Sequence, residues 1–321
     1  MAHLTMNWQE KFGGKRYNTY SYYMNQRYGE RIQKVTVDAG FTCPNRDGTV
    51  ASGGCTYCNN ESFNPGYNSA AKSISDQISE GIEFLNRRYG SKKYVVYFQP
   101  YSNTYASLDR LKKLYEEALA HPHVIGLTIG TRPDCVDEEK ISYLSELAKD
   151  YDVTIEYGLE SISNDTLKKI NRGHDFQSYL DALDITKGRG MKICTHIIIG
   201  FPWENEKFWQ EEAEVLSELD IDYLKIHQLH IVRDTAMARQ HIKQPYNLLK
   251  YEGYLSVLVG VLERLNPNII IQRLFGEAPP RTMLAPRWGI RNSEALQGIE
   301  KELQKLDTWQ GKVFQAKKGV Q

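Results

Sequence analysis

Segments typical of strands alternate with segments typical of helices along most of this chain, and this alternation limits the folds it can adopt. Short apolar stretches are separated by amphipathic stretches with helical spacing. We expect strands over 34–40, 94–100, 124–134, 153–161, 191–202, 222–232 and 268–276. We expect helices over 73–89, 107–120, 137–150, 163–170, 176–188, 205–219, 247–265 and 293–306. Strands that alternate with helices form parallel βαβ units with right-handed crossovers.

The pattern predicts an α/β fold, a partial (β/α)6-type barrel similar to a TIM barrel. A doubly wound open sheet is the alternative, but the glycine-rich phosphate-binding motifs of nucleotide folds are missing. We expect a basic, tyrosine-rich N-terminal arm over 1–33, a core barrel over 34–235, and a C-terminal α/β extension over 236–321 that closes the barrel. In barrels, the loops that follow the strands carry the chemistry.

The composition excludes several classes of protein. The chain has 321 residues, of which 41% are hydrophobic and 25% charged, as in ordinary globular proteins. No apolar run approaches the roughly 18 residues of a membrane span, and the N-terminus lacks the apolar core of a secretory signal. Five cysteines in a chain of this length do not indicate a disulfide scaffold. We therefore expect a cytoplasmic protein in a reducing environment.

Three of the five cysteines lie in one polar, glycine-rich loop directly after the first expected strand. Cys43, Cys55 and Cys58 are separated by eleven residues and then by two. The pair Gly53–Gly54 either lets the backbone bend closely before Cys55 or keeps the loop flexible. The insert residues 45–47 (Asn-Arg-Asp) either shape the pocket around the cysteines or face a substrate.

Three local thiols leave a metal site one ligand short. Thiolates favour zinc or iron–sulfur clusters, and structural zinc normally takes four protein ligands. His174 or His196 could complete a zinc site, although the spacing does not point to either. Cys135 and Cys194 fall in other elements and are expected to be small buried hydrophobic residues. Three cysteines with an open fourth position suit a 4Fe-4S cluster with one accessible iron.

The last cysteine pair reads C-T-Y-C, with an aromatic residue before the final ligand. In this respect the chain resembles radical S-adenosylmethionine (radical SAM) enzymes, and the long first gap resembles the branch related to the catalytic subunit of Elongator. The stretches EYGLES, INRGH and THIIIGFPWEN follow in the order of that family. The resemblance covers about residues 30–235. It implies a 4Fe-4S cluster held by Cys43, Cys55 and Cys58, and S-adenosylmethionine bound to the remaining iron. One electron would cleave this cofactor and yield a 5′-deoxyadenosyl radical.

The resemblance also assigns cofactor contacts. They are Tyr57, Gln99, Tyr101, Asn103, Glu160, Arg172 and His196. An arginine such as Arg172 can clamp a carboxylate with two parallel hydrogen bonds; exposure on the surface is the alternative for Arg172. For His196 the alternative is a structural histidine of the barrel.

Two further groups of residues are candidates for contact with the substrate. The expected strand 222–232 carries His227, Gln228 and His230, which are candidate catalytic residues or members of a structural hydrogen-bond network. Period-two alternation would place Lys225 and His227 on one of its faces and Gln228 and His230 on the other. The candidate RNA contacts are Lys15, Arg16, Arg27, Arg31, Arg273 and Arg281. Basic residues interleaved with tyrosines suit phosphate contact and base stacking, or simply a solvated arm.

Within the family, the chain resembles a small single-module bacterial subgroup implicated in modifying the C5 side chain of the tRNA wobble uridine. This implies conversion of a carboxymethylaminomethyl group to aminomethyl, with tRNA and an electron donor such as flavodoxin or ferredoxin as partners. The alternatives are radical chemistry on a small molecule or a protein, and, in another class, a zinc-stabilised RNA-binding protein without catalysis.

Overall fold

The computed structural model describes residues 7–59 and 68–318. Within these ranges seven strands form one sheet in the order β1-β2-β3-β4-β5-β6-β8, and two more form a separate ribbon, β7-β9. By its internal contacts the chain divides into two compact units, 24–196 and 1–23 with 197–321. The boundaries fall within α2 (Tyr20–Tyr28) and β5 (Lys192–Ile199). The three segments expected above stay a prediction, and their outer ends, 1–6 and 319–321, lie outside the described residues.

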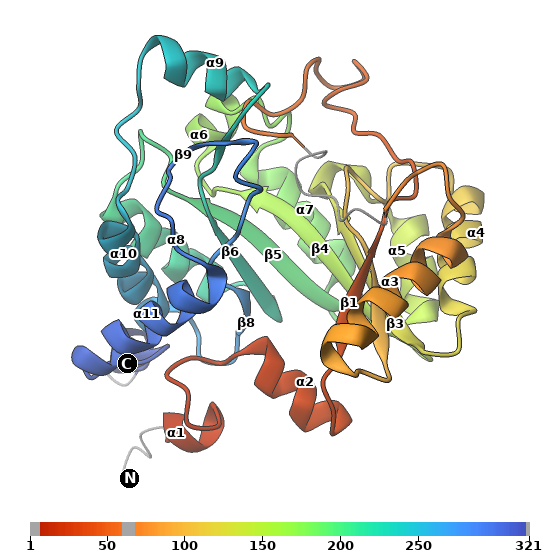
Figure 1. Cartoon of the computed structure of the whole chain (residues 1–321), viewed down its shortest axis with the longest axis horizontal. Helices are drawn as coiled ribbons and strands as arrows, with labels where there is room; N and C mark the ends of the chain where they lie inside the picture. The colour runs from red at the N-terminus through yellow and green to blue at the C-terminus, as the bar shows by residue number, and fades with distance from the viewer. Residues whose placement is uncertain (1–6, 60–67, 319–321) are drawn as a thin grey trace. The chain divides into compact units, whose positions relative to one another are not determined.

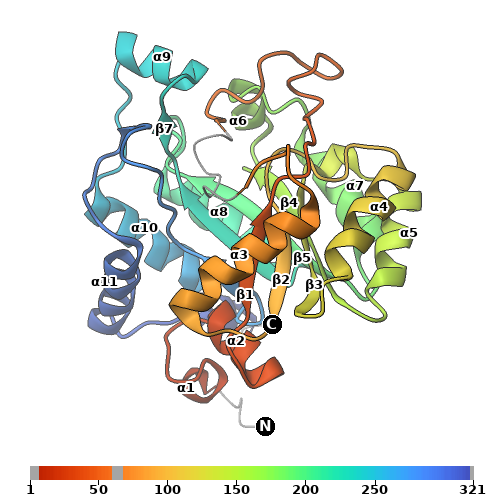
Figure 2. The same cartoon turned by 45° about the vertical axis from the view of Figure 1, so that its right-hand side comes forward.

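The unit 24–196 is a parallel sheet covered on one face by helices (Figures 1 and 2). Its further strands are β1 (Gln33–Val37), β2 (Tyr94–Phe98), β3 (Val124–Thr131) and β4 (Asp152–Glu160). Each of the pairs β1-β2, β2-β3 and β3-β4 is parallel. Its other helices are α3 (Ile74–Tyr89), α4 (Leu108–Leu119), α5 (Glu138–Leu147), α6 (Asn164–Lys169) and α7 (Phe176–Thr186), with the 3-10 turn η2 (Pro133–Cys135).

The helix ends follow from local sequence signals. Ser73 caps α3 by accepting a hydrogen bond from the backbone of Asp76, and Asp137 caps α5 in the same way. Gly90 ends α3 in the left-handed conformation, with φ of 64°. The apolar stripe of α3 then packs against β1, whose Val35 and Val37 are fully buried.

The opposite face of these strands is polar. The register places Tyr97, Thr128 and Thr154 in one row across β2, β3 and β4, and period-two alternation adds Glu156 to the same face of β4. All four are buried, and Glu156 is only 1% exposed. Full α/β barrels fill this face with branched apolar side chains, so a polar row here indicates a different use.

The unit of 1–23 and 197–321 has its own core. Strands β6 (Tyr223–Gln228) and β8 (Ile270–Arg273) pair in parallel, and β7 (Ile231–Val232) pairs antiparallel with β9 (Met283–Ala285). The helices are α1 (Trp8–Lys11), α8 (Glu206–Ser217), α9 (Ala236–Lys243), α10 (Tyr251–Arg264), α11 (Asn292–Lys305) and α12 (Lys312–Lys318). Near the chain ends, Trp8 stacks on Trp309, and Thr19 bridges to Ile271 of β8.

Most expected elements are confirmed within a few residues, with two corrections. The expected strand 222–232 is wrong as one element, because it breaks after Gln228 and continues as β7 in the ribbon. The predicted alternation of side chains between two faces of one strand therefore applies only as far as the end of β6. The helix expected over 247–265 begins only at Tyr251. The short helices α1, α2, α9 and α12 and strand β9 were not predicted, because polar or short segments give weak periodicity.

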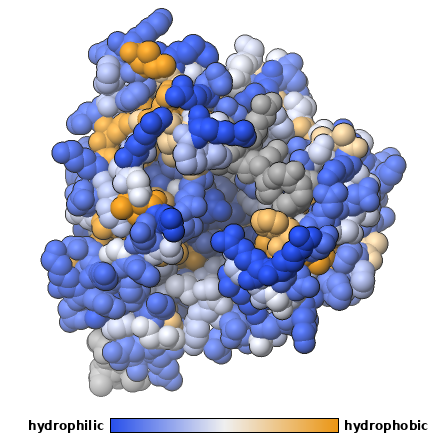
Figure 3. Space-filling view, viewed as in Figure 1, coloured by the Kyte–Doolittle hydropathy of each residue, from blue (hydrophilic) through white to orange (hydrophobic). Residues whose placement is uncertain are grey.

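Some large apolar side chains, such as Ile242 and Phe84, are exposed. The face in Figure 3 is mostly hydrophilic, with smaller apolar areas. No helix among residues 7–59 and 68–318 has the length and apolar character needed to cross a membrane.

Candidate active site

The cysteine loop follows β1 and has little regular structure beyond one bridge between Asp47 and Ser52. It is folded on itself: the backbone N–H of Gly54 donates to the carbonyl of Asn45 at 2.8 Å, and that of Cys58 to Cys55 at 3.0 Å. Gly53 and Gly54 have φ of 80° and 78°. Only glycine adopts this backbone without strain, so the two glycines allow the turn into Cys55.

The loop is docked on the segment that follows α6, at the end of β4 (Figures 1 and 2). The backbone N–H of Thr56 donates to Ile170 at 2.9 Å, and the Asn171 side chain donates to the carbonyl of Gly54 at 2.9 Å. The Asn45 side chain in turn donates to the carbonyl of Asn171. These contacts attach the eleven-residue insert to a turn more than a hundred residues away.

The spacing of the three sulfurs does not suit a single ion. Zinc holds its thiolates about 2.3 Å from the metal, so tetrahedral sulfurs lie about 3.8 Å apart. Among the described residues, one trio of His, Cys, Asp and Glu side chains brings all its ligand atoms within 4.8 Å of one another, and it consists of Glu156, Cys194 and His196. At least one pair of the Cys43, Cys55 and Cys58 sulfurs therefore lies more than 4.8 Å apart, farther than one zinc ion holds two thiolates.

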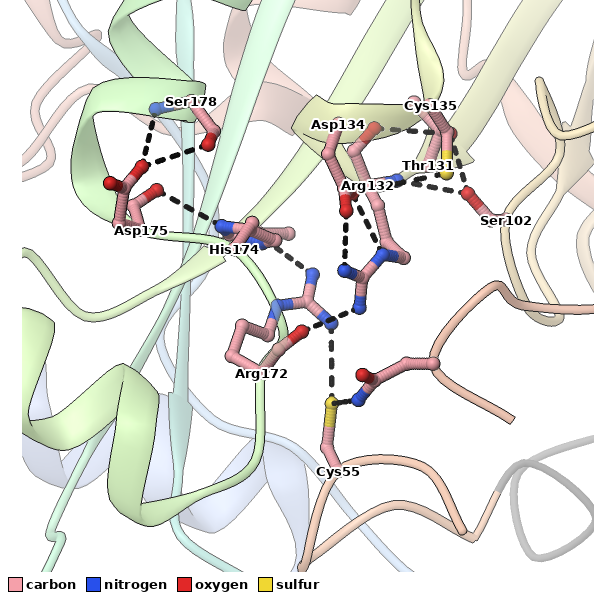
Figure 4. A network of polar contacts seen from close by, with 12 residues as sticks. Cys55, Ser102, Thr131, Arg132, Asp134, Cys135, Arg172, His174, Asp175 and Ser178 are labelled. Carbon is pink, nitrogen blue, oxygen red and sulfur yellow. Dashed lines mark hydrogen bonds and ion pairs between the residues drawn. The ribbon is translucent and has the colours of Figure 1, made fainter. Parts of the chain in front are cut away.

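Two side chains donate toward the Cys55 sulfur. Arg172 Nη1 and Asn45 Nδ2 each lie 3.5 Å from Sγ (Figure 4). Arg46 donates to the carbonyl of Cys58 at 3.0 Å. Burial raises the pKa of the Cys58 thiol to about 11, with Cys55 adding to the rise and Arg46 opposing it. The loop thus combines buried thiols with cationic donors that can offset the charge of thiolates.

Arg172 is buried beside the last strand residue of β4. Its Nη2 lies 3.5 Å from Glu160 Oε1 and donates to the carbonyl of Gly158. Burial alone would lower the pKa of Arg172, but the nearby Cys55, Tyr57 and Glu160 hold it well above its ordinary value. Glu160 has φ of 77°, a conformation that costs energy for a non-glycine residue and is typical of functional sites.

A second buried arginine supports the first. Arg132 Nη1 donates to the carbonyl of Arg172 at 2.7 Å, and its Nε and Nη2 bind both oxygens of Asp134 at 2.8 and 2.6 Å (Figure 4). Burial, followed by the charge of Arg172, lowers the pKa of His174 to about 3. Arg132 and Asp134 were not predicted as site residues. Their position directly after β3 was the signal that could have identified them.

These residues fit the cluster and cofactor that the loop suggests. Arg172 Nε, Asn45 Oδ1 and His174 Nε2 are buried and have no hydrogen-bond partner among the described residues. Buried polar atoms are rarely left without a partner, so these three atoms can take a polar ligand. Arg172 could bind a carboxylate, while the three thiolates are the donor type that iron–sulfur clusters take.

The three candidate residues that follow β2 differ in their burial and in their contacts. Half-buried Gln99 and Tyr101 lie at the end of the strand, and Tyr101 has φ of 65° under the Arg46 guanidinium. Asn103 is fully buried, and its Nδ2 donates to the carbonyls of Phe98, Pro100 and Gly130. The amide nitrogen of Asn103 therefore braces the loop, and only Oδ1 is without a partner among the described residues.

His196 lies on β5 in a row of polar side chains. Its Nε2 is 2.7 Å from Glu156 Oε1, an ion-pair distance, and Glu156 Oε1 accepts a hydrogen bond from the Tyr97 hydroxyl. Cys194 is fully buried, as expected, yet its sulfur belongs to the trio with Glu156 and His196. Sequence analysis missed Tyr97 and Glu156; a glutamate inside the apolar stretch VTIEYGLE was the available signal.

The candidate catalytic residues of 222–232 lie in the unit of 1–23 and 197–321. Gln228 makes two hydrogen bonds with the backbone of Gly276, at 2.7 and 2.9 Å, so its amide braces that loop. His227 Nε2 lies 3.3 Å from Arg273. Burial, followed by the charge of Arg273, lowers the pKa of His230 to about 4.

The six candidate RNA contacts divide by what they already bind. Arg16 pairs with Asp307 at 3.1 Å and lies over the Trp8 ring, and Arg27 pairs with Asp152 at 2.8 Å. Arg31 lies over the Tyr89 ring. Lys15, Arg27, Arg31, Arg273 and Arg281 are exposed, and Arg273 lies 3.3 Å from His227 Nε2. The charges of Arg16 and Arg27 are paired with carboxylates of the protein, which leaves Lys15, Arg273 and Arg281 as the stronger candidates.

The fold and the cysteine loop define a class, and comparison with known proteins identifies it: the chain belongs to the radical SAM superfamily. The superfamily model matches residues 45–216, and the radical SAM C-terminal domain model matches 221–305. The family uses a 4Fe-4S cluster and S-adenosylmethionine, and these are the cofactors of this enzyme. The expectation of a radical SAM enzyme is thus confirmed.

Two relatives match nearly the whole chain. The uncharacterized protein YtqA of Bacillus subtilis is 35% identical over 301 residues, 94% of each chain, and protein YhcC of Escherichia coli is 36% identical over 83% of this chain and 85% of its own length. A tRNA uridine(34) acetyltransferase of Methanocaldococcus infernus is 26% identical over 47% of this chain and 28% of its own length.

The solved structure of Methanocaldococcus infernus Elp3 superposes with a TM-score of 0.64 at 15% identity, covering 87% of this chain and 64% of that one. This similarity concerns the fold. Together with the strand order, it confirms the expected α/β architecture with a partial parallel barrel.

Proposed function

We propose that this radical SAM enzyme modifies the C5 side chain of the tRNA wobble uridine, converting carboxymethylaminomethyl to aminomethyl. The observation that carries the proposal is the three-cysteine loop docked beside Arg172 and Glu160, in a chain related to tRNA uridine(34) acetyltransferases. When bound, the cluster and S-adenosylmethionine supply a carbon radical that removes hydrogen from an unactivated carbon.

The residues of the loop and its surroundings have separate roles in this proposal. Cys43, Cys55 and Cys58 hold the cluster. Arg172 binds the carboxylate of the cofactor's methionine, and Glu160 orients Arg172 from 3.5 Å. Arg132 fixes the backbone of Arg172 through its carbonyl. Since these groups are positioned before the cofactor arrives, little reorganisation is needed on binding.

Tyr57, Gln99 and Tyr101 complete the proposed cofactor site. Tyr57 is half-buried, and its pKa is raised well above the usual value by burial and then by Glu160 and Cys55. Its hydroxyl therefore stays protonated and can act as a donor. On the substrate side, Lys15, Arg273 and Arg281 would contact RNA phosphates, as exposed basic side chains do.

The proposal is tested by the nucleosides of bulk tRNA. Cells that carry only a Cys55→Ala variant should accumulate the carboxymethylaminomethyl nucleoside at the wobble position and lose the nucleosides derived from aminomethyl. Cells with Cys135→Ala, a cysteine outside the loop, should keep the normal profile. An unchanged profile in the Cys55→Ala cells would reject the tRNA substrate and favour a small molecule or a protein.

A further inference from the structure

A row of polar side chains crosses the helix-free face of the unit 24–196. Tyr97 on β2 donates its hydroxyl hydrogen to Glu156 on β4, and Glu156 faces His196 on β5 at 2.7 Å. Lys34 on β1 lies over the Tyr97 ring, 5.3 Å from its centroid. These four side chains come from β1, β2, β4 and β5, and between them β3 places Thr128 on the same face.

Gly130 explains how the row crosses β3. A side chain at Gly130 would approach the Tyr97 ring to 3.7 Å and the carbonyl of Phe98 to 3.2 Å. The Tyr97 ring thus lies across the strand at a position where β3 has no side chain, and its hydroxyl reaches Glu156 two strands away. The tight approach at Gly130 is to the Phe98 carbonyl, and the Tyr97 ring lies at ordinary van der Waals distance from this position.

Burying these polar side chains costs free energy of folding, so we expect the row to have a function. Glu156 is 1% exposed and Tyr97 8% exposed. A carboxylate removed from water loses several kcal/mol unless it is paired and hydrogen-bonded. Apolar side chains would fill the same space at lower cost. The His196 side chain retains 20% exposure, so the row is buried at its centre and accessible at its histidine end.

The row lies close to the proposed cofactor site along β4. Glu156, Gly158 and Glu160 share one face of the strand by period-two alternation. The Arg172 guanidinium lies over Gly158, where a side chain would come within 2.6 Å of Nη2. Two residues of a strand span about 7 Å. Glu156 therefore lies about 7 Å along β4 from Gly158, the position that the Arg172 guanidinium covers.

We propose that His196, held by Glu156 and Tyr97, is the acid–base group that transfers protons on the substrate amine. This inference rests on the proposed function. Because the Glu156 carboxylate faces Nε2, it stabilises the proton on that nitrogen and makes Nδ1 the basic atom. Glu156 and Tyr97 are positioning residues, and they act through His196.

The chemistry of the proposed conversion needs such a group. The methylene between the amine and the carboxylate loses a hydrogen atom and one electron, and the ammonium loses a proton to Nδ1, which leaves an imine. Water adds to the imine carbon, and the carbon–nitrogen bond breaks with its electron pair and a proton going to nitrogen. The products are the aminomethyl group and glyoxylate. The hydrogen atom and the further electron, two electrons in all, end in the methionine and 5′-deoxyadenosine formed from S-adenosylmethionine, and one proton goes to solvent.

The test counts both products with the reconstituted enzyme, a chemical reductant, S-adenosylmethionine and tRNA that carries carboxymethylaminomethyluridine. The wild type should form 5′-deoxyadenosine and aminomethyluridine in a ratio near one. Glu156→Gln and His196→Ala should still release 5′-deoxyadenosine but lose at least about tenfold in aminomethyluridine, within the range of acid–base catalysis. Added imidazole should restore part of the product in His196→Ala.

A matched pair of tyrosine variants separates this role from a general packing role. Tyr97→Phe removes the hydroxyl that binds Glu156, while Tyr157→Phe removes a buried hydroxyl that binds Thr186, beside the helices. Tyr97→Phe should lower product formation severalfold at an unchanged KM for tRNA. Tyr157→Phe should match the wild type in both products.

Four results would overturn the inference. Variants that lose both products in parallel would make His196 a cofactor contact, and variants that keep both would make the row structural. One zinc per chain in protein without the loop cysteines, lost on Cys194→Ala, would make Glu156, Cys194 and His196 a metal site. If the wild type releases 5′-deoxyadenosine but leaves the tRNA unchanged, the proposed function itself fails, and this inference with it.

Discussion

Substitution of Gly173 by alanine should undock the cysteine loop. Gly173 has φ of 80°, and a Cβ there would lie 2.4 Å from Asn45 Oδ1 and 2.9 Å from Val50 Cγ1. Both neighbours belong to the eleven-residue insert, so the insert would have to move. Gly188 is the matched control, because its φ is 73° and an added Cβ would meet nothing within 4 Å.

The two substitutions share one free-energy cost, and Gly173→Ala has a second cost that Gly188→Ala lacks. A left-handed backbone costs a non-glycine residue about 1–2 kcal/mol, and this applies to both. Gly173→Ala should also lose the two hydrogen bonds that Asn45 Nδ2 makes, to the carbonyl of Asn171 and to Cys55 Sγ. At about 1 kcal/mol each, they add about 2 kcal/mol that Gly188→Ala does not lose.

Amide hydrogen exchange of the metal-free protein measures this difference locally. Two kcal/mol corresponds to about 30-fold faster exchange at residues 43–58, seen in Gly173→Ala and not in Gly188→Ala. Gly173→Ala should also bind less iron on reconstitution. Equal exchange of the loop in the two variants would refute the conclusion that docking on Gly173 holds the loop in place.

Three further predictions follow from the site and its surroundings. Arg172→Lys keeps the charge but loses the fork-shaped donor set, so affinity for S-adenosylmethionine should fall about tenfold or more while iron content stays near wild type; unchanged affinity in a binding titration would reject the carboxylate clamp. The pKa of His230, about 4, lies below its value of about 6.5 in an unfolded chain, so its contribution to stability is complete above pH 6.5 and is lost as the pH falls toward 4. His230→Gln should reduce that acid loss by up to about 3 kcal/mol in urea unfolding, and an identical pH profile would contradict it. Arg273→Ala should lower the salt slope of tRNA binding by about 1, whereas Arg16→Ala, whose charge is paired with Asp307, should leave it unchanged; the reverse order would exclude the proposed contact.

The elements were predictable because their signals are local. Ser73, Asp137 and Gly90 mark helix ends within a few residues of the positions they cap. The break after Gln228 was not predictable in this way, since IHQLHIV reads as one continuous strand. Its partner in the ribbon, β9, lies some fifty residues further along the chain, and no local pattern announces that pairing.

The residues of the candidate site divide in the same way, into those with a local signal in the sequence and those without one. The three cysteines were predicted from residue type and spacing, and Glu160 and Arg172 from the family resemblance; their roles stay predictions. The support of Arg132 and the row of Tyr97 and Glu156 were not predicted, because each depends on contacts between different strands. The insert shows this most clearly: Asn45 binds the carbonyl of Asn171, 126 positions away, so the sequence alone left the role of the insert open.

The central claim is tested most directly by one incubation. Reconstituted enzyme, a reductant and S-adenosylmethionine are mixed with tRNA that carries carboxymethylaminomethyluridine at the wobble position, and both products are counted by mass spectrometry. The account predicts one 5′-deoxyadenosine for each aminomethyluridine formed, and neither product with Cys55→Ala. Release of 5′-deoxyadenosine with no change in the wobble nucleoside would contradict it.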